Sequence, residues 1–135
     1  MMKTIKYLLL FAIGMTISVS SCKKDSAAKS KKDILTSHQW RISYYKLNGQ
    51  IEPMADCDKD DFVVFSANGT YIWNPTTVKC NSNETTEVGV WSLSADETVF
   101  SIDYSVATLN ELTNSKLVIT SKDGTDTMEQ GFTAF

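Results

Sequence analysis

The feature that most constrains the fold is a series of short runs in which apolar and polar residues alternate, each bounded by turn-forming residues. Alternation with period two is typical of half-buried strands, because successive side chains of a strand point to opposite faces. Trp40, Ile42 and Tyr44 follow this pattern in the first run. Strands are therefore expected at residues 40–45, 62–65, 70–74, 88–93, 98–104, 107–112, 116–120 and 127–135.

Short turn sequences connect these runs. Asn48-Gly49 and Asn68-Gly69 carry the strongest short hairpin signal. Since consecutive hairpins form a meander, and closure of a meander removes its exposed edges, we expect an all-β domain: an eight-stranded antiparallel up-and-down barrel. A two-sheet sandwich of the same strands is the alternative that periodicity leaves open. Residues 33–38 are expected to form a short helical turn, capped by Asp33, that covers one barrel end.

The N-terminal residues have the pattern of a secretory signal peptide. Lys3 and Lys6 precede an almost uninterrupted apolar stretch, residues 7–19, and a positive segment before about a dozen apolar residues is typical of such a signal. The stretch is shorter than the roughly 20 residues with which a helix crosses a membrane. We therefore expect residues 1–21 to be a cleaved leader.

Residues 19–22, Val-Ser-Ser-Cys, resemble the cleavage site of a bacterial lipoprotein. The resemblance implies that Cys22 is acylated and becomes the first residue of the mature protein, and several acyl chains on one residue anchor a protein firmly. An ordinary cleaved signal peptide with a coincidental cysteine is the alternative. Lys23 rather than Asp follows Cys22. By the same resemblance this implies the outer membrane, either on its periplasmic face or at the cell surface.

Charge is segregated along the chain. Residues 23–33 contain five Lys and two Asp, a formal charge of +3, and no large apolar side chain, so residues 22–33 are expected to form a flexible basic tether. The tether either serves as a spacer or favours an anionic membrane surface. Residues 34–135 contain six basic and fourteen acidic residues, a formal charge of −8. This acidic body argues against nucleic acid as a partner, because phosphates attract basic proteins.

Several segments of the domain resemble the lipocalin-like domain of small bacterial lipoproteins. They are residues 35–42 (LTSHQWRI), 57–62 (CDKDDF), 65–71 (FSANGTY) and 89–93 (GVWSL), with Cys80 upstream of the last segment. The resemblance covers nearly all of residues 34–135. It implies a small lipocalin-like β-barrel.

Cys57 and Cys80 are an even pair once Cys22 is acylated, and an exported protein meets an oxidising compartment. We therefore expect them to form a disulfide. For a separation of 23 residues, the loop-entropy relation gives a stabilisation on the order of 3 kcal/mol. A reactive or metal-binding pair is the alternative, although no histidine adjoins either cysteine.

Asp56, Asp58 and Asp60 surround Cys57 and form a weak candidate for a calcium site, because hard cations prefer several oxygen ligands. The chain departs from an EF-hand loop where that loop requires Gly and Glu, which makes a solvated acidic loop the expected alternative. We assign no metal site to these residues.

The sequence lacks the usual signatures of an enzyme. His38 is the single histidine, and there is no Gly-x-Ser-x-Gly elbow, phosphate-binding loop, dinucleotide fingerprint or zinc spacing. We therefore expect a non-enzymatic protein that needs no cofactor.

Whether the barrel holds a ligand depends on how its large aromatic side chains pack. In a hollow barrel the expected walls of an apolar pocket are Trp40, Phe65, Trp73, Trp91 and Phe100. The alternative is that these rings fill the barrel. The first case predicts a lipid-anchored, monomeric barrel that binds a small apolar or amphiphilic molecule. The second predicts an accessory lipoprotein that engages a protein or glycan through its surface.

Overall fold

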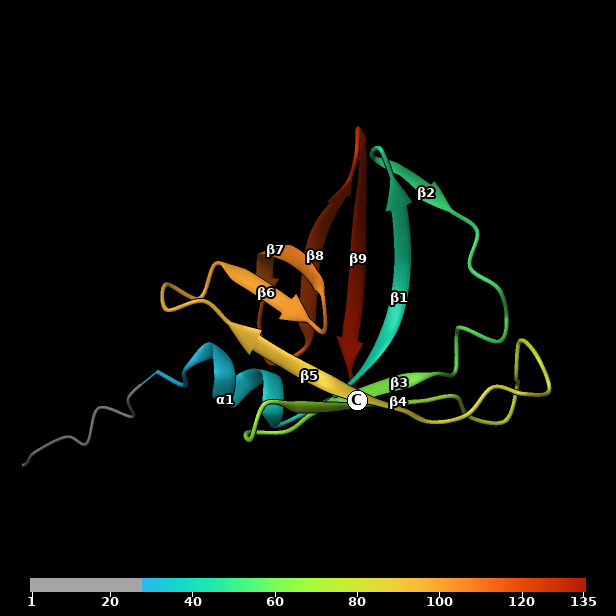
Figure 1. Ribbon diagram of the computed structural model, residues 1–135, viewed down its shortest axis with the longest axis horizontal. Helices are drawn as coiled ribbons and strands as arrows, with labels where there is room; N and C mark the ends of the chain where they lie inside the picture. The colour runs from blue at the N-terminus through green and yellow to red at the C-terminus, as the bar shows by residue number, and fades with distance from the viewer. Residues whose placement is uncertain (1–27) are drawn as a thin grey trace, which may run out of the picture.

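Nine antiparallel strands and one short helix make up the computed structural model, which describes residues 28–135 (Figure 1). The predicted leader, Cys22 and most of the tether lie outside the described residues. In chain order the elements are α1 (Lys31–Thr36), β1 (Gln39–Leu47), β2 (Gln50–Glu52), β3 (Phe62–Phe65), β4 (Thr70–Asn74), β5 (Glu87–Leu93), β6 (Val99–Ile102), β7 (Ser105–Leu112), β8 (Lys116–Asp123) and β9 (Asp126–Ala134).

The sheet closes on itself. β1 pairs with β3, each later strand pairs with the next, and β9 pairs back along most of β1. These eight strands form the predicted antiparallel barrel, and its closure excludes the two-sheet alternative. β2 is an additional strand that pairs only with β1, through a turn in which Asn48 and Gly49 both have positive φ (50° and 84°). Its residues are all exposed, so no alternation marked it in the sequence.

The predicted strand boundaries differ from the observed ones where pairing or turn geometry decides. β3 and β4 coincide with the predicted runs. β6 ends at Ile102, before its predicted end, because Asp103 adopts a φ of 48° in the turn to β7. β8 continues to Asp123 because it stays paired with β9 as far as Asp126.

The helix begins earlier than expected, and the prediction of Asp33 as its cap was wrong. Ser30 is the N-cap: its Oγ accepts from the Asp33 backbone N–H at 3.0 Å, and Asp33 Oδ2 accepts from the Ser30 N–H at 3.3 Å. This reciprocal pair is a capping box, in which the N3 carboxylate supports the cap. The last residues assigned to the tether, from Lys31 to Asp33, are therefore helical.

The helix covers one end of the barrel, as predicted. Leu35 is 1% exposed, and its carbonyl accepts from Trp40 Nε1 at 2.8 Å. Lys31 Nζ donates to the Glu97 carbonyl in the β5–β6 turn at 2.7 Å. We call this the closed end; it also includes the β3–β4 and β7–β8 turns. The opposite end, which we call the open end, consists of residues 48–61, 75–87, 103–104 and 122–126.

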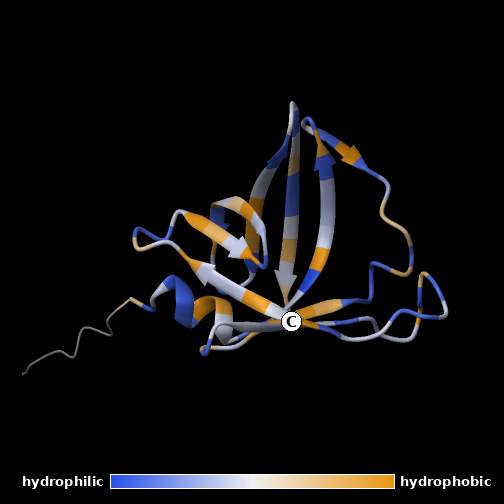
Figure 2. Ribbon diagram, in the orientation of Figure 1, coloured by the Kyte–Doolittle hydropathy of each residue, from blue (hydrophilic) through white to orange (hydrophobic). Residues whose placement is uncertain are grey.

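Aromatic side chains fill the closed half of the barrel. Trp40, Phe65 and Phe100 are almost wholly buried. The Phe65 ring meets Trp91 and Phe100 edge-on, at centroid distances of 5.6 and 5.4 Å, the geometry that aromatic quadrupoles favour. In Figure 2 the hydrophobic colour collects on β3, β6 and the end of α1, whereas the far halves of β1 and β9 are largely hydrophilic.

The barrel and its helical cover are complete within residues 30–135. Across the described part of the chain, no helix has the length and apolar character needed to cross a membrane.

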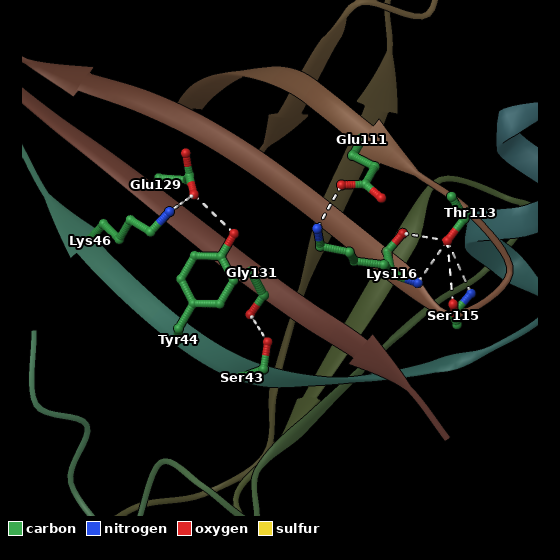
Figure 3. A network of polar contacts seen from close by, with 9 residues as sticks. All are labelled: Ser43, Tyr44, Lys46, Glu111, Thr113, Ser115, Lys116, Glu129 and Gly131. Atoms are coloured by element: carbon green, nitrogen blue, oxygen red, sulfur yellow. Dashed lines mark hydrogen bonds and ion pairs between the residues drawn. The ribbon is translucent and has the colours of Figure 1, made fainter. Parts of the chain in front are cut away.

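The outer face of the β1–β9 seam carries a polar network (Figure 3). Tyr44 Oη donates to Glu129 Oε1 at 2.9 Å, and Lys46 Nζ pairs with the same oxygen at 2.9 Å. The hydrogen bond from Lys46, followed by that from Tyr44, lowers the pKa of the Glu129 carboxyl. The Tyr44 ring lies over Gly131, where an added Cβ would collide with it. Ser43, at the bulge of β1, donates to the Gly131 carbonyl at 2.9 Å. Glycine at position 131 therefore lets the ring lie flat across the seam.

Candidate functional site

A cavity of about 290 Å³ lies inside the barrel, between the packed closed half and the open end. This volume lies just below the range of roughly 300–1,000 Å³ found for small-molecule sites, so the cavity suits a small ligand. The lining comes from β3 to β9 and consists of Val63, Phe65, Tyr71, Trp73, Glu87, Phe100, Ile102, Ser105, Val106, Ala107, Ile119, Ser121 and Gln130.

Strand alternation places apolar residues deeper in the cavity than polar ones. On β8, Ile119 is followed two residues later by Ser121, on the same inward face. On β5 the inward row runs from Trp91, near the closed end, to Glu87 at the open end. The cavity thus has an aromatic and aliphatic floor and a rim of Glu87, Ser105, Ser121 and Gln130.

A second hollow, of about 360 Å³, lies at the closed end between α1 and the β3–β4 and β5–β6 turns. Its lining combines Trp91, Ser92 and Leu93 of β5 with turn residues whose side chains are mostly small or polar, such as Gly69 and Ser94. It offers less apolar wall than the barrel cavity, which is therefore the better candidate for a ligand site.

The structure brings together three of the five predicted wall residues. Phe65, Trp73 and Phe100 line the cavity, whereas Trp40 and Trp91 do not. Trp40 is fully buried and Trp91 is 5% exposed, and Trp91 Nε1 donates to the Ser66 carbonyl at 3.0 Å. Both indoles fill the closed half, because they stand nearer to that end of their strands. The sequence predicted either a pocket lined by these rings or a barrel filled by them. The structure combines the two, since one half of the barrel is filled and the other half is hollow.

A buried carboxylate, Asp61, holds the Trp73 wall in place. Asp61 is 2% exposed; its Oδ2 accepts from Trp73 Nε1 and its Oδ1 from the Thr76 backbone N–H, both at 3.2 Å. Burial raises the pKa of the Asp61 carboxyl, and these two hydrogen bonds oppose the rise. The sequence analysis considered a solvated acidic loop around Cys57 and did not single out Asp61. Asp61 precedes the inward-facing Val63 and Phe65 by two and four residues, and this period-two spacing was the signal that could have placed it inside the barrel.

A disulfide ties together the two long loops of the open end. Cys57 and Cys80 are bonded, with their Cα atoms 5.1 Å apart, which confirms the predicted pair. Asp58 lies beside the two sulfurs and completes a group at metal-ligand spacing. Because both sulfurs are in the disulfide, neither is a thiolate that could hold a metal.

The other acidic residues of this loop have separate partners. Asp56 pairs with Lys59 at 2.5 Å. Asp60 Oδ2 accepts from the Thr76 hydroxyl and from the Val78 N–H, the latter at 3.3 Å. These hydrogen bonds lower the pKa of both carboxyls. Within residues 28–135, Asp56, Asp58 and Asp60 do not form a group of carboxylates at metal-ligand spacing.

A hydrogen-bonded contact between strands forms another part of the cavity wall. Tyr71 Oη donates to Asp103 Oδ2 at 2.6 Å, and the Val90 N–H donates to Asp103 Oδ1 at 2.9 Å. The hydrogen bond to Asp103, followed by burial, raises the pKa of Tyr71 to about 12. The Tyr71 ring passes over Gly89, where an added Cβ would lie 2.5 Å from ring carbon Cε1. Sequence reasoning missed this contact, which joins β4, β5 and the β6–β7 turn.

The single histidine lies away from the cavity. His38 packs edge-on against Trp40 at the closed end, with ring centroids 5.7 Å apart, and it is not among the lining residues. The cavity lining therefore contains neither a histidine nor a cysteine. What it offers is shape, aromatic surface and one carboxylate.

Comparison with known proteins agrees with this architecture. The lipocalin-like domain family matches residues 37–119, which is more than half of the 135-residue chain. None of the curated proteins matches the chain. The matched segment contains the strands that build most of the cavity, from β1 to the first half of β8. The chain therefore belongs to the lipocalin-like domain family.

Proposed function

We propose that this protein is a non-catalytic binding protein that holds a small apolar or amphiphilic molecule in the barrel cavity, while acylated Cys22 anchors it to the outer membrane. The observation that carries the proposal is the cavity itself, about 290 Å³ with an aromatic and aliphatic floor. Burial of an apolar ligand against such a floor is favourable by roughly 25 cal/mol per Å² of apolar surface. The polar rim suits a ligand with one polar end.

The absence of a catalytic constellation in the cavity supports a binding role. Glu87 is the one carboxylate in the lining. The nearby carboxylates of Asp61 and Asp103 accept hydrogen bonds that hold the walls together. A general acid–base mechanism needs groups placed for proton transfer to a substrate, and Asp61 and Asp103 serve the fold instead.

The test is binding of the neutral fluorophore N-phenyl-1-naphthylamine to the purified protein. We expect its emission to rise on binding, and Ala107→Phe, which fills the cavity from β7, to abolish the rise. Thr108→Phe is the matched control, because Thr108 is the next residue on the same strand and is exposed on the outer face. Since added volume in a packed interior destabilises, thermal unfolding checks the fold of each variant, and Ser121→Phe fills the rim instead. Equal emission from the wild type and both filled variants would contradict the proposal.

One observation favours the alternative function, engagement of a partner by the outer surface. Val88 and Val90 on β5 and Val106 on β7 are 70, 58 and 62% exposed, and Tyr104, in the β6–β7 turn at the open end, is fully exposed. Contiguous exposed apolar residues often mark an interaction site. A photocrosslinker at Val90 should then capture a defined partner in the native cell, whereas one at exposed Thr133 on β9 should not.

A further inference from the structure

The mouth of the cavity carries negative charge that no lining residue neutralises. Glu87 lies on the rim, and none of the lining residues is Lys, Arg or His. Glu87 also belongs to none of the three ion pairs formed among residues 28–135. The carboxylate is exposed, so its charge faces the solvent at the entrance.

A second carboxylate, Asp103, is hydrogen-bonded to a residue of the cavity lining. Asp103 accepts from Tyr71 Oη at 2.6 Å and from the Val90 N–H at 2.9 Å, and these hydrogen bonds keep the pKa of its carboxyl low. Glu87 is close enough to Tyr71 for its charge to contribute to the high pKa of that phenol. Asp103 is therefore hydrogen-bonded to the hydroxyl of this cavity-lining ring, and the charge of Glu87 acts on the same hydroxyl.

The whole open end is acidic, whereas the closed end is not. Segments 48–61, 75–87, 103–104 and 122–126 contain ten acidic and three basic residues, a formal charge of −7. At the closed end, residues 28–38 and 94–98 contain three acidic and three basic residues, so their formal charge is zero. A surface of one sign around an opening attracts ions of the other sign and repels those of its own.

Aromatic residues line the cavity next to this charge. Trp73 pairs directly with Glu87 across β4 and β5, and both line the cavity together with Tyr71. A cation over the face of such a ring is attracted by about 0.5–2 kcal/mol. A carboxylate at the same position would gain only the neutral donors Ser105, Ser121 and Gln130, and it would face two like charges.

We propose that the cavity selects amphiphiles by the charge of their polar end, accepting an alkyl chain that carries an ammonium group and rejecting one that carries a carboxylate. The inference rests on the proposed binding function and adds the chemical class of the ligand. Glu87 attracts the head group, the Trp73 and Tyr71 faces contact it, and the apolar floor receives the chain.

The experiment compares three ligands of equal chain length: decyltrimethylammonium, decanol and decanoate, each below its micelle concentration. The protein is residues 22–135 with Cys22→Ser, which retains the complete barrel and helix, and the readout is displacement of N-phenyl-1-naphthylamine. We expect the ammonium compound to bind on the order of tenfold more tightly than decanoate, with decanol between them. High salt should reduce the difference in affinity between the ammonium compound and decanoate, because it screens charge at the mouth of the cavity.

Two variants locate the origin of the selectivity. Glu87→Gln should weaken decyltrimethylammonium binding several-fold and leave decanol unchanged. Glu84→Gln is the matched control: it removes the same charge from the loop that leads into β5, but Glu84 accepts from the Cys80 N–H at 2.8 Å and does not line the cavity. It should therefore have little effect on any of the three ligands.

The possible failures point to different causes. If none of the three ligands displaces the fluorophore, the proposed binding function fails. If decanol binds but decanoate matches the ammonium compound, the binding function stands and the charge selectivity is refuted. Equal effects of Glu87→Gln and Glu84→Gln would also refute the selectivity at the cavity mouth, because the preference would then come from the overall charge of the open end.

Discussion

Replacement of Tyr71 by Phe tests the contact that joins three strands at the cavity wall. The substitution keeps the ring over Gly89 and removes only the hydroxyl, whose hydrogen bond to Asp103 measures 2.6 Å. We expect the variant to fold into the same barrel and to lose stability, because the β6–β7 turn loses its connection to β4.

The structure supplies the magnitude in two ways. A hydrogen bond to a charged acceptor contributes about 1.5–3 kcal/mol. The pKa of Tyr71, about 12 against an ordinary value of 10.0, corresponds to about 3 kcal/mol, since one pH unit is about 1.4 kcal/mol. Tyr71 is only 9% exposed, so water screens its hydroxyl little. Water does reach the Asp103 carboxylate once the hydroxyl is gone, and we therefore expect a loss of about 1.5–2 kcal/mol.

The same contact gives a pH dependence with a defined sign. Folding raises the pKa of Tyr71, so its contribution is fully present below pH 10, the unfolded value, and is lost as the pH rises toward about 12. Phenylalanine has no proton to lose. The difference in the free energy of unfolding between wild type and Tyr71→Phe should therefore be constant from pH 7 to 9. It should decrease between pH 10 and 12.

Urea unfolding followed by tryptophan fluorescence measures both effects. Tyr104→Phe is the matched control, because Tyr104 is fully exposed next to Asp103, and its free energy of unfolding should equal that of the wild type. A change of less than about 0.3 kcal/mol in Tyr71→Phe at pH 7 would refute the assignment, since additive errors are of that size. So would a difference that stays constant up to pH 12.

Three further predictions concern other parts of the molecule. Cys57→Ala should lower the free energy of unfolding by on the order of 3 kcal/mol in oxidising buffer, because the bond to Cys80 closes a loop with a separation of 23 residues; with reductant, mutant and wild type should unfold at similar urea concentrations. Gly131→Ala should cost about 1–3 kcal/mol, because the new methyl group displaces the Tyr44 ring; an unchanged urea midpoint would show that the ring moves freely. Cys22→Ser should abolish metabolic labelling with an alkynyl fatty acid and release the protein from the membrane fraction, whereas persistent labelling would place the acyl group elsewhere.

Much of the architecture is determined by local sequence. The period-two pattern depends only on side chains two residues apart, and this is why β3 and β4 coincide with their predicted runs. Asn68-Gly69 likewise specifies its hairpin locally. The start of α1 was also within reach, since Ser30 followed three residues later by Asp33 is a capping-box pattern. β2 carried no such signal, because its three residues are all exposed and it depends on pairing with β1.

The site was decided by the tertiary structure. Composition and alternation put the large aromatic residues inside, but whether a ring fills the barrel or lines a cavity depends on its height along the barrel axis, which strand stagger and the helix set. Trp40 and Trp91 therefore pack at the closed end, whereas Trp73 faces the cavity.

The sequence by itself determined the eight barrel strands, most of the hairpins, the cysteine pair and the excess of acidic residues, because each follows from neighbours in the chain or from composition. Only the tertiary structure decided that β9 closes onto β1, that Tyr71 reaches Asp103 across Gly89, and that Glu87 stands at the mouth of a cavity. These contacts join residues far apart in the chain. Their geometry arises from the closure of the whole barrel, which no short stretch of sequence encodes.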